Sequence, residues 1–241
     1  MNTIKISRLT ESTKIGNMLV GMLVIGSIWG LLDAITVIYI SPLFHMRKLC
    51  LCPLSVVVYG FTLMSIALVI YRKPLMLIGI GIIAASFKLL DFIFIPLPVI
   101  NNHINYQPVV NPALAAITVA IIYALFSGIL LNKLENNKFM LILIGTVSGF
   151  INTIAFTYIA FYVVQTPPLI VESPLQFIFP FHAPMSALLG AFFLPFGFWL
   201  ESRLHNKISI LQTKKVSLYY IGSGAIVTFS LLACIIILIT R

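Results

Sequence analysis

The sequence predicts an all-α polytopic membrane helix bundle of six to seven transmembrane helices, and two observations carry that prediction. Of the 241 residues, 60% are hydrophobic and only 9% are charged, whereas soluble domains are about one-quarter charged. Seven stretches are each long enough to cross a bilayer, which takes about 20 apolar residues. We therefore expect a single transmembrane domain over residues 1–241. The expected spans are 17–40, 51–71, 75–97, 111–132, 139–164, 181–200 and 217–239.

The ends of these spans carry recognisable boundary residues. Lys5, Arg8 and Lys14 precede the first apolar run, as basic residues would in a signal peptide. This run is too long for a signal peptide and no small-residue cleavage site follows it, so we expect it to remain as the first span. Later boundaries carry prolines, which cost little at a helix end, and aromatic residues typical of the membrane interface. These residues are Pro42, Pro74, Pro98, Pro112, Tyr71, Trp199, Tyr219 and Tyr220.

Lysine and arginine are distributed unequally between the two sides of the expected bundle. One side carries 11 of them and the other carries three, namely Arg47, Lys48 and Arg241. The basic side consists of the N-terminus and the segments 72–74, 133–138 and 201–216. Because basic loops stay in the cytoplasm, we expect a cytoplasmic N-terminus, an outer C-terminus and a place in the cytoplasmic (inner) membrane. The same clusters explain the formal charge of +9, so we expect no nucleic-acid partner.

Two loops on the expected outer side carry no basic residue. The first, over residues 98–110, includes His103 and Gln107, and Asn111 begins the span that follows. The second, over residues 165–180, holds one glutamate and several prolines. Long, stiff or polar loops carry function more often than plain connections do. We therefore expect these loops at the mouth of a site.

The third expected span carries two charges within the membrane, Lys88 and Asp91. A charge near the bilayer centre costs at least about 2.5–3.5 kcal/mol, so it normally faces protein or water. At helical spacing these two residues share a face with Gly81 and Ala84. This face is expected to point into the bundle, because small residues let helices approach closely.

Polar groups on several spans gather in the expected outer half of the membrane. Counted along the helices, Asp33, Lys88 and Asn152 lie about 20–24 Å from the inner ends of their spans, and His182 starts the sixth span from outside. Three further faces combine small and polar residues: Gly26, Gly30 and Asp33; Gly145, Ser148, Gly149 and Asn152; and His182, Ser186 and Gly190. The sequence thus predicts an outward-facing polar cavity that binds a small solute, with Lys88 facing an anionic group. The candidate ligand-binding residues are Lys88, Asp91, Asp33, His182, Asn111, Gln107, His103 and Asn152.

Two other interpretations use the same charged residues. Lys88 can pair with Asp91 or Asp33 and only fix the helix packing, which would make the chain an accessory or structural membrane subunit. Alternatively, Asp33, Asp91 and His182 can form a proton relay. The sequence alone does not separate these interpretations from solute capture.

A membrane enzyme or thiol-redox protein is a further alternative. His45, Cys50 and Cys52 are soft-metal or thiol ligands at close spacing. However, a lone CxC lacks the second pair that makes a zinc site credible. The chain contains no GxSxG, HExxH, Walker or CxxCH motif. The sequence therefore identifies no catalytic residue, no cofactor and no metal.

On the first span, Gly21, Gly26 and Gly30 form a row of small residues. In its organisation the chain resembles the S components of energy-coupling-factor transporters, which are small membrane proteins of mostly six spans that capture vitamins or metal ions near the outer surface. That family has an alanine-spaced motif where these glycines stand; the motif itself is absent here, and a seventh span departs from the usual six. The resemblance implies a membrane partner subunit and cytoplasmic ATPases. It transfers no binding residue.

Overall fold

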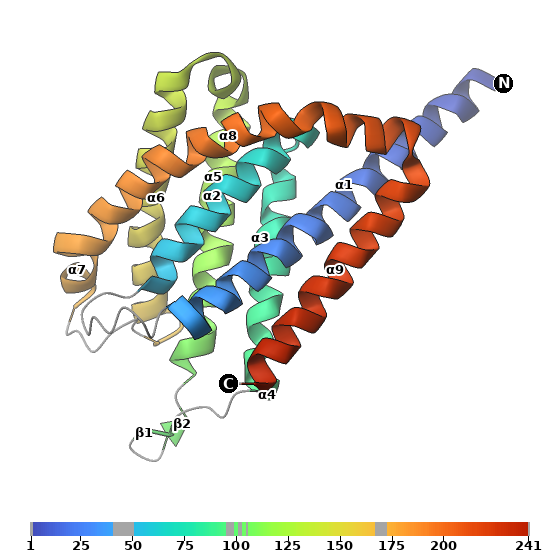
Figure 1. The fold of residues 1–241 in the computed structure, drawn as a ribbon. Helices are drawn as coiled ribbons and strands as arrows, with labels where there is room; N and C mark the ends of the chain where they lie inside the picture. Colours follow the sequence, from blue (N-terminus) through green and yellow to red (C-terminus); the bar gives the residue numbers. More distant parts are fainter. Residues whose placement is uncertain are drawn as a thin grey trace.

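The computed structural model describes residues 2–40, 51–94, 99–100, 103–104, 106–166 and 173–240. This part of the chain is an all-α polytopic membrane bundle, with seven helices long and apolar enough to cross a membrane, one for each expected span (Figure 1). The elements are α1 (Asn2–Ile35), the π-helical η1 (Thr36–Ile40), α2 (Leu51–Tyr71), α3 (Leu75–Leu89), α4 (Asp91–Phe94), β1 (Val99–Ile100), β2 (His103–Ile104), α5 (Gln107–Asn136), α6 (Lys138–Tyr162), α7 (Pro174–Phe177), the π-helical η3 (Ile178–His182), α8 (Ala183–Lys214) and α9 (Val216–Ile239).

Several helix boundaries differ from those expected. Helix α1 begins at Asn2 rather than at residue 17, and α8 continues to Lys214 rather than ending at residue 200. Hydropathy marks only the apolar part of a helix, whereas helical hydrogen bonding continues into polar flanks that contain good helix formers such as lysine and glutamine. The third expected span is divided into α3 and α4 at Leu90. The N–H of Leu90 donates to the carbonyl three residues earlier, that of Phe87, at 3.3 Å.

Most of the long helices pack against two or more others. Helix α3 contacts both α1 and α5, α2 contacts α1, α5 and α8, and α6 contacts α5 and α8. Helix α9 packs mainly along α1 and leaves most of its surface exposed. The start of α1 and the end of α9 lie at opposite ends of the bundle (Figure 1). We call the end that carries β1, β2, α7 and the end of α9 the hairpin end.

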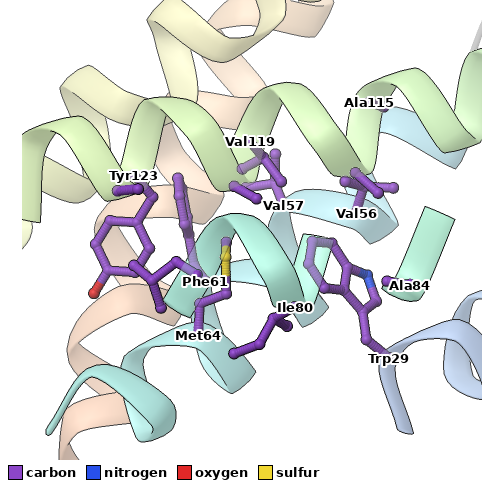
Figure 2. Packing of buried hydrophobic residues seen from close by; sticks show 14 of the residues in the cluster. Trp29, Val56, Val57, Phe61, Met64, Ile80, Ala84, Ala115, Val119 and Tyr123 are labelled. Carbon is purple, nitrogen blue, oxygen red and sulfur yellow. The ribbon is translucent and has the colours of Figure 1, made fainter. Parts of the chain in front are cut away.

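The apolar core lies where α1, α2, α3 and α5 meet. Figure 2 shows Trp29, Phe61, Ile80 and Tyr123 converging from these four helices, and all four side chains are fully buried. The Phe61 and Tyr123 rings pack edge to face with their centroids 5.5 Å apart. Because lipid tails are as apolar as these side chains, close packing rather than exclusion from water is what favours their association.

Glycines bring α6 and α8 together backbone to backbone. A methyl group at Gly145 would collide with the carbonyl of Gly190, and one at Gly149 would collide with the carbonyl of Ser186. The two helices are therefore antiparallel at this contact, so that residues just after Gly149 face residues just before Ser186. The buried, small face that the sequence predicts on each helix is confirmed.

A hydrogen-bonded group of side chains holds α9 at the end opposite the hairpin end. The hydroxyls of Tyr71 and Tyr219 lie 3.0 Å apart, and the Gln212 side-chain amide donates to the Tyr71 hydroxyl at 3.1 Å. Tyr220 donates to the Asn17 side chain at 2.9 Å. These bonds tie α9 to α1, α2 and α8.

Candidate functional site

Two groups of buried polar residues, in the part of the chain that the structure describes, contain residues that the sequence predicts for the site. The first, the ion-pair cluster, consists of Asp33 on α1, Ser55 on α2 and Lys88 on α3. Lys88 Nζ lies 3.0 Å from Asp33 Oδ2, with the two side chains only 3% and 5% exposed. The Ser55 hydroxyl donates to Asp33 Oδ1 at 3.0 Å. Each oxygen of the Asp33 carboxylate therefore has its own partner from a different helix.

Two further residues, Asp91 and Cys234, are buried near the ion-pair cluster. Asp91 begins α4, one helical turn after Lys88, and is buried together with Gly81 and Ala84 on the same face, as the sequence predicts. Cys234 is fully buried, in a small apolar cluster that contains Phe87. Helix α9 thus covers an apolar area next to the ion-pair cluster.

The second group, the polar seam, lies between α6 and α8. It consists of Ser148 and Asn152 on α6, of His182 at the end of η3 and of Ser186 in the first turn of α8. All four are at most 4% exposed. Each has a buried polar atom without a hydrogen-bond partner: Ser148 Oγ, Asn152 Oδ1, His182 Nε2 and Ser186 Oγ. Buried polar groups in native proteins usually have a protein or water partner, so four such atoms at one contact require an explanation.

The helix register places these four residues at the same contact. Gly149 meets the backbone of Ser186. Asn152 lies three residues beyond Gly149 on α6, and His182 lies four residues before Ser186, so both side chains project from the contacting faces. Ser148 lies one turn before Asn152. The four side chains thus lie within about one helical turn of each other along the two facing helices.

The chain before α8 fixes the orientation of the His182 ring. Phe179 precedes a proline, which disfavours the helical conformation, and it has the extended angles φ −109° and ψ 142° inside an otherwise helical segment. In this kinked segment the Phe177 carbonyl lies 2.9 Å from His182 Nδ1, and the Phe177 ring stacks on the His182 ring at 4.0 Å. A carbonyl can only accept, so Nδ1 carries the proton and neutral His182 presents a lone pair at Nε2.

The serines of the polar seam differ from other hydroxyl residues of the bundle. Ser27, Ser127 and Thr157 donate to carbonyl oxygens three or four residues earlier in their own helices. This bond satisfies a hydroxyl that is buried in a membrane helix. Ser148 and Ser186 make no hydrogen bond. Their hydroxyls are therefore available to another group.

The remaining candidates from the sequence lie elsewhere. Asn111 is buried on the first turns of α5; its Oδ1 accepts a hydrogen bond from Thr166 at 2.9 Å, while its Nδ2 has no partner. Gln107 begins α5 and is half-buried. The side chain of His103, in β2, lies outside the described residues. The structure thus joins Asp33 to Lys88, and the register of α6 against α8 places Asn152 and His182 at the same helix contact.

The thiol and metal candidates fall mostly outside the described part. His45, Cys50 and the side chain of Cys52 are not among the described residues. Within the described residues, no group of three or more His, Cys, Asp or Glu side chains could hold a metal ion.

Sequence reasoning did not select Ser55, Ser148 or Ser186 as site residues. Spacing contained a signal for two of them, because Ser148 lies four residues before Asn152 and Ser186 lies four residues after His182. Ser55 had no such signal, because its contact with Asp33 depends on how α1 and α2 pack.

Comparison of the chain with protein-family models, curated proteins and solved structures gave no match.

Proposed function

We propose that this integral membrane protein binds a small solute at the polar seam and serves as the binding subunit of a transport system. One observation carries the proposal: four buried polar atoms on two facing helices have no partner. Leaving a buried polar group unpaired costs roughly 1–3 kcal/mol. A molecule that supplies the missing hydrogen bonds would recover much of this cost. If the contact only held the two helices together, apolar side chains in place of these four residues would avoid the cost altogether.

The position of Lys88 changes the role that we propose for it. Its charge is offset by Asp33 at 3.0 Å, and Asp33 is further held by Ser55. We therefore assign the capture of solute to His182 and Asn152, rather than to Lys88, and we assign the ion-pair cluster to holding α1, α2 and α3 together. Partner subunits of the energy-coupling-factor type, and their cytoplasmic ATPases, remain a prediction from the resemblance.

A structural or accessory subunit is the second candidate function. The ion-pair cluster favours it, because a charge pair shared among three helices can specify their packing without touching any ligand. On this alternative, the polar seam would hold water alone.

Native mass spectrometry of the full chain, purified in mild detergent from its own membrane, tests the proposal. We expect a small molecule bound to the wild-type protein and to the Thr157→Val variant, but not to the Asn152→Leu variant. Thr157 is the matched control, because it is a buried polar residue of the same helix whose hydroxyl is already bonded to Thr153. A folded wild-type protein without any bound small molecule would refute solute capture and favour the structural alternative.

A further inference from the structure

The unpartnered buried atoms that His182 and Asn152 contribute to the polar seam are both hydrogen-bond acceptors. His182 uses its single ring proton on the Phe177 carbonyl, so its Nε2 can only accept. The unpartnered atom of Asn152 is the carbonyl oxygen Oδ1, which is also an acceptor. Two acceptors cannot bond each other. An occupant that bonds both atoms must therefore supply two N–H or O–H groups, while Ser148 and Ser186 can either donate or accept.

The surroundings of the seam favour an uncharged occupant. The buried charged residues of the described chain are Asp33, Lys88, Asp91 and Glu201, and none of them belongs to the seam. Among the described residues a cation would thus have no buried carboxylate in the seam, and the positive end of the α8 dipole would also oppose it. An anion would face two acceptor atoms. A buried charge without a partner is far more costly than a buried neutral group.

The packing around the seam limits the size of the occupant. On one side the backbones of α6 and α8 touch at Gly149 and Ser186, which leaves no room for a side chain between them. On the hairpin side the Phe177 ring covers one face of His182. The occupant must therefore be small.

We propose that the polar seam binds a small uncharged molecule of the primary amide class, which carries two N–H donors. These donors bond to His182 Nε2 and Asn152 Oδ1. This inference rests on the proposed function, because it names the class of solute. Ser148 and Ser186 hydroxyls complete the site by bonding the remaining polar atoms of the occupant.

Nitrogen-15 NMR of the histidine-labelled full chain, with acetamide as the probe, tests this inference. The His182 signals are assigned by their loss in His182→Gln. In the free protein we expect a proton on Nδ1 only. Acetamide should shift the Nε2 resonance saturably, whereas N,N-dimethylacetamide, which has no N–H, should not.

Variants separate binding at the seam from binding elsewhere. Asn152→Leu should weaken acetamide binding about tenfold, the effect of losing one hydrogen bond. If the Asn152→Leu protein does not fold, Ser186→Ala replaces it in this test. Thr157→Val should bind as the wild type does. No saturable shift with acetamide, or a shift with methylammonium or acetate instead, would overturn the assignment of the class. Proposed solute capture would fail separately, if native mass spectrometry finds no bound molecule.

Discussion

Replacing Lys88 by methionine is the sharpest perturbation of the ion-pair cluster. Methionine keeps most of the length of the side chain but removes the ammonium group that lies 3.0 Å from Asp33. The Asp33 carboxylate would then stay buried on α1 with the Ser55 hydroxyl as its remaining partner in the cluster. The change tests whether the pair holds three helices together.

The expected loss of stability follows from the burial of both groups. Breaking a buried ion pair by removing one partner costs about 3–5 kcal/mol. Because the Ser55 bond to Asp33 remains, we expect the lower value, about 3 kcal/mol, or roughly a hundred-fold change in the unfolding equilibrium. The double variant Asp33→Leu with Lys88→Met removes both charges of the pair, so it should recover part of the stability that Lys88→Met alone loses.

Equilibrium unfolding in mixed micelles provides the assay. The fluorescence of Trp29, which is fully buried one turn before Asp33, reports on this region in a Trp199→Phe background. Lys73→Met is the matched control, since Lys73 is exposed, and such a surface change should stay within about 0.5 kcal/mol. A Lys88→Met protein as stable as the control, or a double variant no better than the single one, would refute the reasoning.

Three further predictions concern other parts of the bundle. Gly149→Val should destabilise the protein by at least about 2 kcal/mol, because its side chain would collide with the α8 backbone; Gly222→Val on α9, where nothing lies within 4 Å of the added carbon, should change the unfolding free energy by less than about 1 kcal/mol. Tyr71→Phe should cost about 1–2 kcal/mol in the same unfolding assay, since it removes the hydroxyl bonded to α8 and α9, and an unchanged midpoint would argue against that tie. Finally, a membrane-impermeant maleimide added to intact cells, in a background without the native cysteines, should label Thr240→Cys but not Lys207→Cys; the opposite pattern would reverse the predicted orientation.

The sequence was sufficient for the bundle and for most of its buried faces. Seven apolar stretches predicted seven helices, and the small and polar faces of α1, α3, α6 and α8 are buried as expected. This works because a membrane helix must satisfy its own backbone and must be apolar over a fixed length. Both requirements are local and can be read from composition and spacing.

The partners of the buried polar residues could not be predicted in the same way. Spacing alone offered both Asp33 and Asp91 as partners for Lys88, and it could not show the contact with Asp33 because that contact depends on how α1 packs against α3. Likewise, the proton position on His182 depends on a kink at Phe179 that brings the Phe177 carbonyl to the ring. Helix ends were misplaced for a related reason, because polar flanks continue a helix without adding hydropathy.

A high-resolution structure of the protein purified from its own membrane tests solute capture most directly. We predict density for a small non-protein molecule between α6 and α8, within hydrogen-bonding distance of His182 Nε2 and Asn152 Oδ1. The contradicting result is a seam in which the Asn152 amide donates directly to His182, with water or nothing beside it. That outcome would leave the buried polar residues with a packing role alone.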